Sequence, residues 1–169
     1  MHGNRRLRKA RIAAAIYMFL ASCAWATDFI GRASVIDGDT IEISGEGIRL
    51  HGIDAPESWQ ICKDANNKPY RCGKIAADAL DRFLAKSRPT ICEARGRDRY
   101  RRVVADCSRS DGVLVNAWLV EQGYAVDWVR YSRGEYAEEQ RSAQKAKRGI
   151  WQGPFDMPYE ARAKNRKTR

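Results

Sequence analysis

Short apolar runs separated by glycine-containing turns constrain the fold of this chain more than any other feature. Residues 29–36, 40–44 and 48–53 each have the composition of a short strand, with Gly38 and Gly45-Glu46-Gly47 in the turns between them. Runs this short, joined this tightly, predict three short strands, of which the second and third form a hairpin. The chain has 169 residues, too few for a large barrel, and nothing repeats at a period of 20–50 residues, so solenoids and propellers are excluded.

The rest of the chain alternates between helical and strand patterns. Apolar side chains at positions 76, 80, 83 and 84 share one face of a helix predicted for residues 73–87. The further expectations are strands over 90–96 and 101–107, helices over 113–122 and 136–148, and an extended segment over 125–129. Five strands with a helix between the third and fourth predict an α+β fold. The specific expectation is a five-stranded OB-type β-barrel with about three helices packed on it.

The N-terminus has the pattern of an export signal. A basic stretch precedes an apolar run from Ile12 to Ala26, which ends in the A-x-A cleavage pattern Ala24-Trp25-Ala26. The run is too short for a good membrane-spanning helix. We therefore expect residues 1–26 to be a signal peptide and the protein to be exported, to the periplasm or the medium. An uncleaved N-terminal anchor and lipoprotein cleavage before Cys23 are the alternatives.

The net charge of +10 sits at the two ends of the chain. Residues 1–26 carry a net charge of +5 and residues 160–169 a net charge of +4, which leaves +1 for residues 27–159. Basicity alone therefore does not indicate a nucleic-acid partner, and local clusters must carry that argument. We expect one domain over residues 27–159, followed by a loose basic tail over residues 160–169.

Four cysteines remain once the predicted signal peptide is removed. Cys62 and Cys72 flank a polar loop, while Cys92 and Cys107 fall on two strand-like runs joined by a short turn. We predict the disulfides Cys62–Cys72 and Cys92–Cys107, as suits an oxidising compartment. A zinc site is disfavoured, because the chain has no CxxC motif and only His51 lies outside the signal.

Carboxylates suited to a hard cation follow the first predicted strand. In Asp37-Gly38-Asp39-Thr40, two carboxylates lie two residues apart at a strand end, where oxygen donors suit Ca²⁺ or Mg²⁺. Further on, Arg49 and Asp54 are five residues apart, so they share a face only if the strand ends or bulges between them. Glu57 follows Pro56, which holds it off the sheet where its carboxylate can act as a base on water.

A third cluster is the turn over residues 95–102, which holds five arginines and Tyr100. Guanidinium groups match phosphate oxygens, and a tyrosine among them can stack on a base. Taken singly, each cluster also reads as an ordinary turn or a solvated surface. Together they supply what phosphodiester hydrolysis needs, because its transition state gathers negative charge on the phosphoryl oxygens.

Five motifs in this order resemble those of the staphylococcal nuclease-like family, the thermonucleases. They are VIDGDT, IRLHGIDAPES, DRYRR, VNAWLVEQGYA and AEEQRSAQKAKRGIW, and the resemblance covers about residues 28–152. It implies one bound Ca²⁺, a nucleic-acid substrate and a monomer. The staphylococcal enzyme itself lacks the disulfides.

The resemblance also implies roles at matching positions. The implied catalytic residues are Arg49, Arg102 and the general base Glu57. The implied calcium ligands are Asp39, Asp54 and the backbone carbonyl of Ala55, with Asp37 in the outer shell. The implied substrate contacts are Arg99, Tyr100 and Tyr131. Three positions depart from the family pattern: Ala55 replaces a usual threonine, Arg101 a frequent glycine, and Val129 one tyrosine of a base-stacking pair.

The function expected from these observations is an exported, Ca²⁺-dependent nuclease that hydrolyses DNA, RNA or both and leaves 3′-phosphate ends. A non-catalytic nucleic-acid-binding OB module is the first alternative. An exported scaffold protein that adheres through its basic tail is the second.

Overall fold

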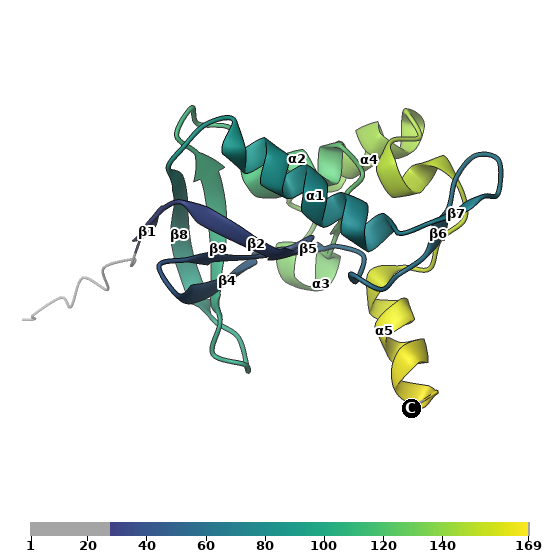
Figure 1. Ribbon diagram of the computed structural model, residues 1–169, viewed down its shortest axis with the longest axis horizontal. Helices are drawn as coiled ribbons and strands as arrows, with labels where there is room; N and C mark the ends of the chain where they lie inside the picture. Colours follow the sequence, from purple (N-terminus) through teal and green to yellow (C-terminus); the bar gives the residue numbers. More distant parts are fainter. Residues whose placement is uncertain (1–27, 169) are drawn as a thin grey trace, which may run out of the picture.

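A six-stranded mixed sheet forms the centre of the fold (Figure 1). The computed structural model describes residues 28–168, so the predictions made for residues 1–26 lie outside the described part. The strands are β1 (Asp28–Gly31), β2 (Ala33–Asp37), β3 (Thr40–Ile43), β4 (Glu46–Leu50), β8 (Thr90–Arg97) and β9 (Val103–Arg109). Their hydrogen-bonded order is β1-β8-β9-β4-β3-β2, and only the β4–β9 pair is parallel.

The sheet confirms the predicted α+β class, but it has six strands and does not form a clear five-stranded barrel. The segment predicted as one strand over residues 29–36 is two strands that separate at Arg32, because β1 pairs with β8 and β2 pairs with β3. These two strands are consecutive in the chain yet lie at opposite ends of the sheet order. The sheet must therefore curl for Arg32 to join them, but no ladder closes it between β1 and β2 within the described residues.

Two short pairs of strands flank the sheet. β5 (Ile53–Asp54) pairs with β10 (Val126–Asp127), and β6 (Cys62–Lys63) pairs with β7 (Pro69–Tyr70). Both predicted disulfides are present: Cys92–Cys107 joins directly opposed residues of β8 and β9, and Cys62–Cys72 ties the β6–β7 hairpin to the first helix. Pairs of this kind suit an oxidising compartment.

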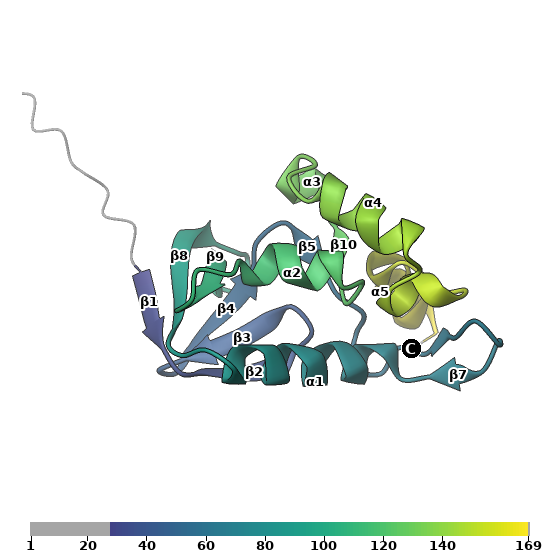
Figure 2. The same ribbon diagram turned by 90° about the horizontal axis from the view of Figure 1, so that it is seen from above.

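Helices pack around this framework (Figure 2). They are α1 (Cys72–Ala85), α2 (Val115–Glu121), α3 (Val129–Ser132), α4 (Ala137–Lys145), the 3₁₀ helix η1 (Gly149–Gln152) and α5 (Pro158–Lys167). The face predicted for the first helix is confirmed, since its apolar residues are buried in the core: Ala76, Leu80, Phe83 and Leu84. Full burial of a leucine such as Leu80 contributes about 2 kcal/mol. No helix within residues 28–168 is long and apolar enough to cross a membrane.

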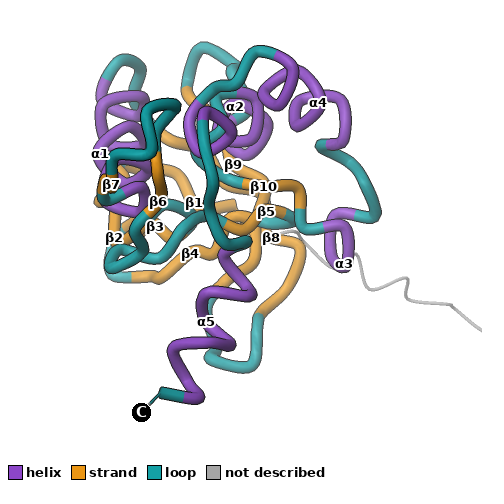
Figure 3. Tube along the Cα trace, turned by 90° about the vertical axis from the view of Figure 1, so that its right-hand side faces the viewer, coloured by secondary structure: helices purple, strands orange, loops and turns teal. Residues whose placement is uncertain are grey.

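The C-terminal segment differs from the prediction. A loose tail was expected after Glu160, but residues 158–167 form α5, which begins with Pro158 at a position where proline favours a helix start. Only Pro158 and Ala161 of this helix are buried. The helix extends away from the rest of the molecule (Figures 1 and 3). Its first turns nevertheless reach the candidate site.

Candidate active site

A turn after β4 brings Arg49 and Asp54 to the same place. β4 ends at Leu50, and Gly52 adopts a φ of +71° before the chain re-enters a strand at Ile53. A Cβ at Gly52 would lie 3.0 Å from atoms of Ser132 and Tyr136, so glycine suits the turn on both counts. The strand thus ends between Arg49 and Asp54, which allows two residues five positions apart to lie on the same side. The Arg49 guanidinium donates to Asp54 Oδ1 at 3.1 Å.

Gly38 allows the carboxylate-bearing turn to lie against Ala55. A Cβ at Gly38 would stand 2.7 Å from Ala55 Cβ, closer than packed carbon atoms approach. Asp39 Oδ2 accepts a hydrogen bond from the Ala55 amide at 2.8 Å, and its other oxygen pairs closely with Arg49. Asp37 instead closes its own turn, accepting from the Asp39 amide at 3.1 Å. The predicted inner and outer carboxylates therefore have distinct environments.

Two buried aspartates bridged by one arginine form the centre of the site. Asp39 is 2% exposed and Asp54 is 0% exposed. Burial raises the pKa of Asp39 to about 7, although the neighbouring Arg49 acts in the opposite direction. Two carboxylates this deep are costly to hold in their charged form without cations beside them.

A second arginine, from α5, reaches the same centre. The two Nη atoms of Arg162 donate to the two carboxylate oxygens of Asp54 at 2.8 and 2.9 Å. Nη1 also donates to Glu57 Oε1 at 2.8 Å. Burial acts to lower the pKa of Arg162, but the hydrogen bonds to the two carboxylates outweigh it and raise that pKa. Arg162 is therefore a fixed positive charge between the predicted metal ligand and the predicted base.

The loop that carries Glu57 is fixed by contacts with Gln60 and α1. The Glu57 amide donates to Gln60 Oε1 at 3.3 Å, and Gln60 Nε2 donates to the Asp156 carbonyl at 2.7 Å. Gly73, at the start of α1, leaves room for the loop, because a Cβ there would lie 1.8 Å from the Glu57 carbonyl oxygen. The position of this carboxylate therefore depends on a close approach between loop and helix.

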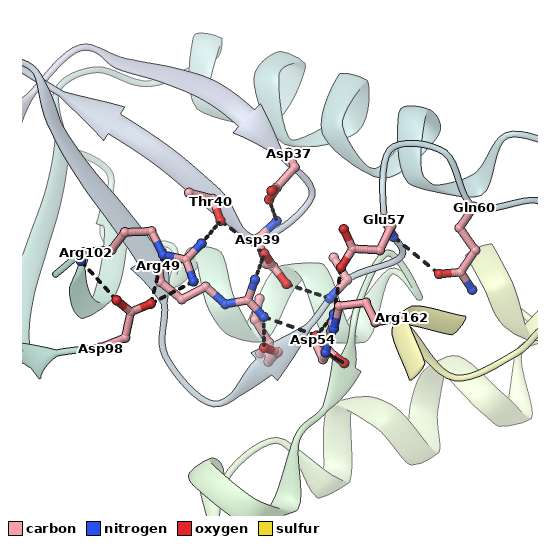
Figure 4. Close-up of polar contacts among 12 residues, drawn as sticks. Asp37, Asp39, Thr40, Arg49, Asp54, Glu57, Gln60, Asp98, Arg102 and Arg162 are labelled. Carbon is pink, nitrogen blue, oxygen red and sulfur yellow. Dashed lines mark hydrogen bonds and ion pairs between the residues drawn. The ribbon is translucent and has the colours of Figure 1, made fainter. Parts of the chain in front are cut away.

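Arg102 approaches the centre from the opposite side. It donates to Asp98 Oδ2 through Nε at 2.9 Å and to Thr40 Oγ1 through Nη1 at 3.4 Å. Burial acts to raise the pKa of Asp98, but hydrogen bonds led by that from Arg102 lower it overall. Thr40 in turn donates to Asp39 Oδ1 at 3.3 Å. A continuous chain of polar contacts thus runs from Arg102 to Glu57 (Figure 4).

Exposed aromatic residues lie on both sides of this chain of contacts. Tyr100 is 65% exposed at the tip of the β8–β9 turn, with the guanidinium carbons of Arg99 and Arg102 at 4.8 and 5.7 Å from its ring centroid. Tyr131, on α3, packs edge-on against Trp128, whose ring centroid lies 5.6 Å from the guanidinium of Arg162. The predicted substrate contacts therefore border the centre without joining its hydrogen bonds.

The donor chemistry at the centre fits a hard cation. Within residues 28–168, no group of three or more His, Cys, Asp or Glu side chains is placed to hold a metal ion. The two aspartates and the neighbouring Ala55 carbonyl offer oxygen atoms, the ligands that Ca²⁺ prefers. Ca²⁺ commonly completes a set of six to eight ligands with water molecules. Asp54 already holds a cation, the guanidinium of Arg162. The residues present are compatible with one bound Ca²⁺.

The sequence patterns missed four residues of the site: Thr40, Gln60, Asp98 and Arg162. Thr40 and Asp98 lie inside the quoted motifs, and the spacing of Asp98 and Arg102 at i and i+4 could have indicated their pairing. Arg162 gave no such signal, because 105 residues separate it from Glu57 along the chain.

Sequence comparison identifies proteins related to this chain. The family model described as staphylococcal nuclease homologue matches residues 47–153. The chain is 53% identical over 137 residues to the succinoglycan biosynthesis protein ExoI of Rhizobium meliloti (strain 1021), covering 81% of this chain and 72% of that protein. It is 31% identical over 149 residues to an uncharacterized endonuclease of Escherichia coli, covering 85% and 88% of the two chains.

A micrococcal nuclease of Shigella flexneri is 28% identical over 159 residues, covering 85% of this chain and 84% of its own. The family match includes Arg49, Asp54, Glu57 and Arg102 and ends before α5 begins. The motifs, the fold around them and the extent of the match lead to one assignment. The chain belongs to the staphylococcal nuclease homologue family.

Proposed function

We propose that the protein is an exported, Ca²⁺-dependent nuclease that hydrolyses phosphodiester bonds in DNA, RNA or both. The observation that carries this proposal is the pair of buried aspartates, Asp39 and Asp54, bridged by Arg49. Glu57 is linked to Asp54 through the guanidinium of Arg162. Relatives named as an endonuclease and a micrococcal nuclease support it. The two disulfides support export.

Proton transfer falls to Glu57. Its side chain is 28% exposed, so water can reach the carboxylate, while the loop contact with Gln60 fixes its backbone. In the proposed reaction Glu57 accepts a proton from water as the water oxygen bonds to phosphorus. The bond from phosphorus to the 5′-oxygen breaks, that oxygen takes a proton from solvent water, and the product ends in a 3′-phosphate.

Charge stabilisation falls to two arginines. Arg49 lies on β4 and Arg102 in the turn between β8 and β9, and each is partly exposed, at 15% and 32% of the side chain. Guanidinium groups held in place by carboxylates can meet the negative charge that develops on the phosphoryl oxygens, without reorganising first. A Ca²⁺ held by Asp39, Asp54 and the Ala55 carbonyl would supply further polarisation of the phosphate.

Contacts with the rest of the substrate fall to the bordering side chains. Arg99 can pair with a phosphate, and Tyr100 and Tyr131 can stack on bases, because all three lie at the rim with accessible surface. Stacking tolerates any base, so these contacts suit a nuclease with little sequence preference.

A metal-controlled cleavage assay tests the proposal. The oxidised protein is incubated with single-stranded DNA, duplex DNA and RNA in Ca²⁺, in Mg²⁺ and in EGTA, and product ends are analysed. We expect cleavage in Ca²⁺ that stops in EGTA, returns on adding Ca²⁺ and leaves 3′-phosphates. The Asp54→Asn variant should lose cleavage, while Asp81→Asn, an exposed carboxylate on α1, should keep it. A folded protein that binds these polymers without cleaving them would instead favour the binding module.

A further inference from the structure

Arg162 occupies the groups that the proposed reaction needs free. Both oxygens of Asp54 accept hydrogen bonds from it, and Oδ1 accepts from Arg49 as well. The same guanidinium holds Glu57 Oε1 at 2.8 Å. A carboxylate whose lone pairs are directed at a guanidinium is a poorer cation ligand and a weaker base than a free one.

The helix that carries Arg162 is held to the body by few other contacts. Only Pro158 and Ala161 of α5 are buried, and the Lys164–Asp156 ion pair joins α5 only to the residues just before it, with the two side chains 65% and 48% exposed. The Trp128 ring adds a face on which the guanidinium of Arg162 rests, 5.6 Å from the centroid. Exposed ion pairs contribute little, so the contact with Asp54 and Glu57 is the main polar attachment of the helix.

We propose that α5 is a tethered inhibitor, in which Arg162 holds Asp54 and Glu57 in the calcium-free protein and withdraws when Ca²⁺ binds. The proposal rests on the proposed calcium-dependent function, and it adds a mode of regulation that the proposed reaction does not require. A guanidinium and a Ca²⁺ ion compete for the same buried carboxylate, because both are cations and each oxygen of Asp54 already accepts a hydrogen bond from Arg162.

The competition sets the size of the expected effect. If the population with α5 docked exceeds the undocked population by about tenfold, the apparent Kd for Ca²⁺ is higher than the intrinsic Kd by about the same factor. Removing the guanidinium removes that penalty. The coupling is reciprocal: bound Ca²⁺ lowers the docking equilibrium constant of α5 by the same factor by which docked α5 lowers the affinity for Ca²⁺.

Calcium titration calorimetry tests the proposal without relying on activity. The proteins are the wild type, Arg162→Ala, Arg162→Gln and the control Arg166→Ala. Arg166 is exposed one turn further along α5, so its removal changes the charge without touching the site. We expect a roughly tenfold tighter Kd for both Arg162 variants and a wild-type Kd for Arg166→Ala. Thermal unfolding confirms that each variant is folded.

Hydrogen exchange gives the second readout and separates displacement from a general charge effect. In the wild type, the amides of α5 should exchange faster when Ca²⁺ is added, whereas in Arg162→Ala they should exchange fast with or without Ca²⁺. An unchanged or weaker Ca²⁺ affinity in both Arg162 variants, or α5 amides that Ca²⁺ leaves unchanged or protects in the wild type, would overturn the proposal while leaving the calcium site intact. If none of the four proteins binds Ca²⁺, the calcium site fails and this inference fails with it.

Discussion

Replacing Gly73 with alanine should damage the site through a single methyl group. The added Cβ would lie 1.8 Å from the Glu57 carbonyl oxygen, 2.4 Å from its carbonyl carbon and 2.9 Å from the Pro56 oxygen. Ordinary contacts are about 3.5 Å or more, so the loop must retreat by roughly 1.7 Å. A displacement of about 1 Å at a catalytic group can cost about 100-fold in rate. We therefore expect turnover to fall by at least that factor.

For the same variant, the sign of the change in the free energy of unfolding is also informative. Exchanging glycine for alanine inside a helix ordinarily stabilises a protein by about 0.5–1 kcal/mol. Here overpacking should cost about 1–3 kcal/mol, so the net effect is destabilising and the Tm should fall by several degrees.

Initial rates of DNA hydrolysis and thermal unfolding are the assays for this variant. Lys74→Ala is the control, because Lys74 is exposed and its ion pair with Asp78 contributes only tenths of a kcal/mol. A Gly73→Ala protein that cleaves within threefold of the control and melts no lower than the wild type would show that the Glu57 loop does not depend on the missing side chain at residue 73.

Three further perturbations address other parts of the account. Arg102→Ala should lower kcat by about 10²–10³-fold with little change in Tm, because its partner Asp98 is 20% exposed and can be solvated; a kcat near that of the wild type would remove Arg102 from the reaction. Reducing Cys62–Cys72 and Cys92–Cys107 should lower stability by about 3 kcal/mol for each bridge, seen as a lower Tm in dithiothreitol, and an unchanged Tm would contradict this. Tyr131→Ala should weaken oligonucleotide binding by about 1–3 kcal/mol in a fluorescence titration, and equal affinity would exclude stacking at this residue.

Local patterns predicted most of the elements and the inner residues of the site. The turn after the first predicted strand, with Gly38 between two aspartates, is where the buried carboxylate of Asp39 lies. The five-residue spacing of Arg49 and Asp54 required an interruption in the strand, and the Gly52 turn provides it. These features depend on neighbours in the chain, so the sequence alone could predict them.

Features that depend on distant partners were not predictable in this way. The first strand splits at Arg32 because its two halves find different partners, one on β8 and one on β3, and no local residue encodes that choice. Helix α5 has a strongly polar composition and few buried residues, so its sequence reads as a solvated tail. Its place at the site comes from the ion pairs that Arg162 makes with residues more than 100 positions away.

The most direct test of the account is the single-turnover rate of DNA cleavage by Glu57→Gln at saturating Ca²⁺. Glutamine keeps the shape of the side chain and removes its capacity to take a proton. Glu42→Gln, an exposed carboxylate on β3, is the matched control. We expect Glu57→Gln to be slower than the wild type by about 10²–10⁴-fold, and the control to be unaffected. A Glu57→Gln protein that cleaves at the rate of the control would contradict the assignment of Glu57 as the base.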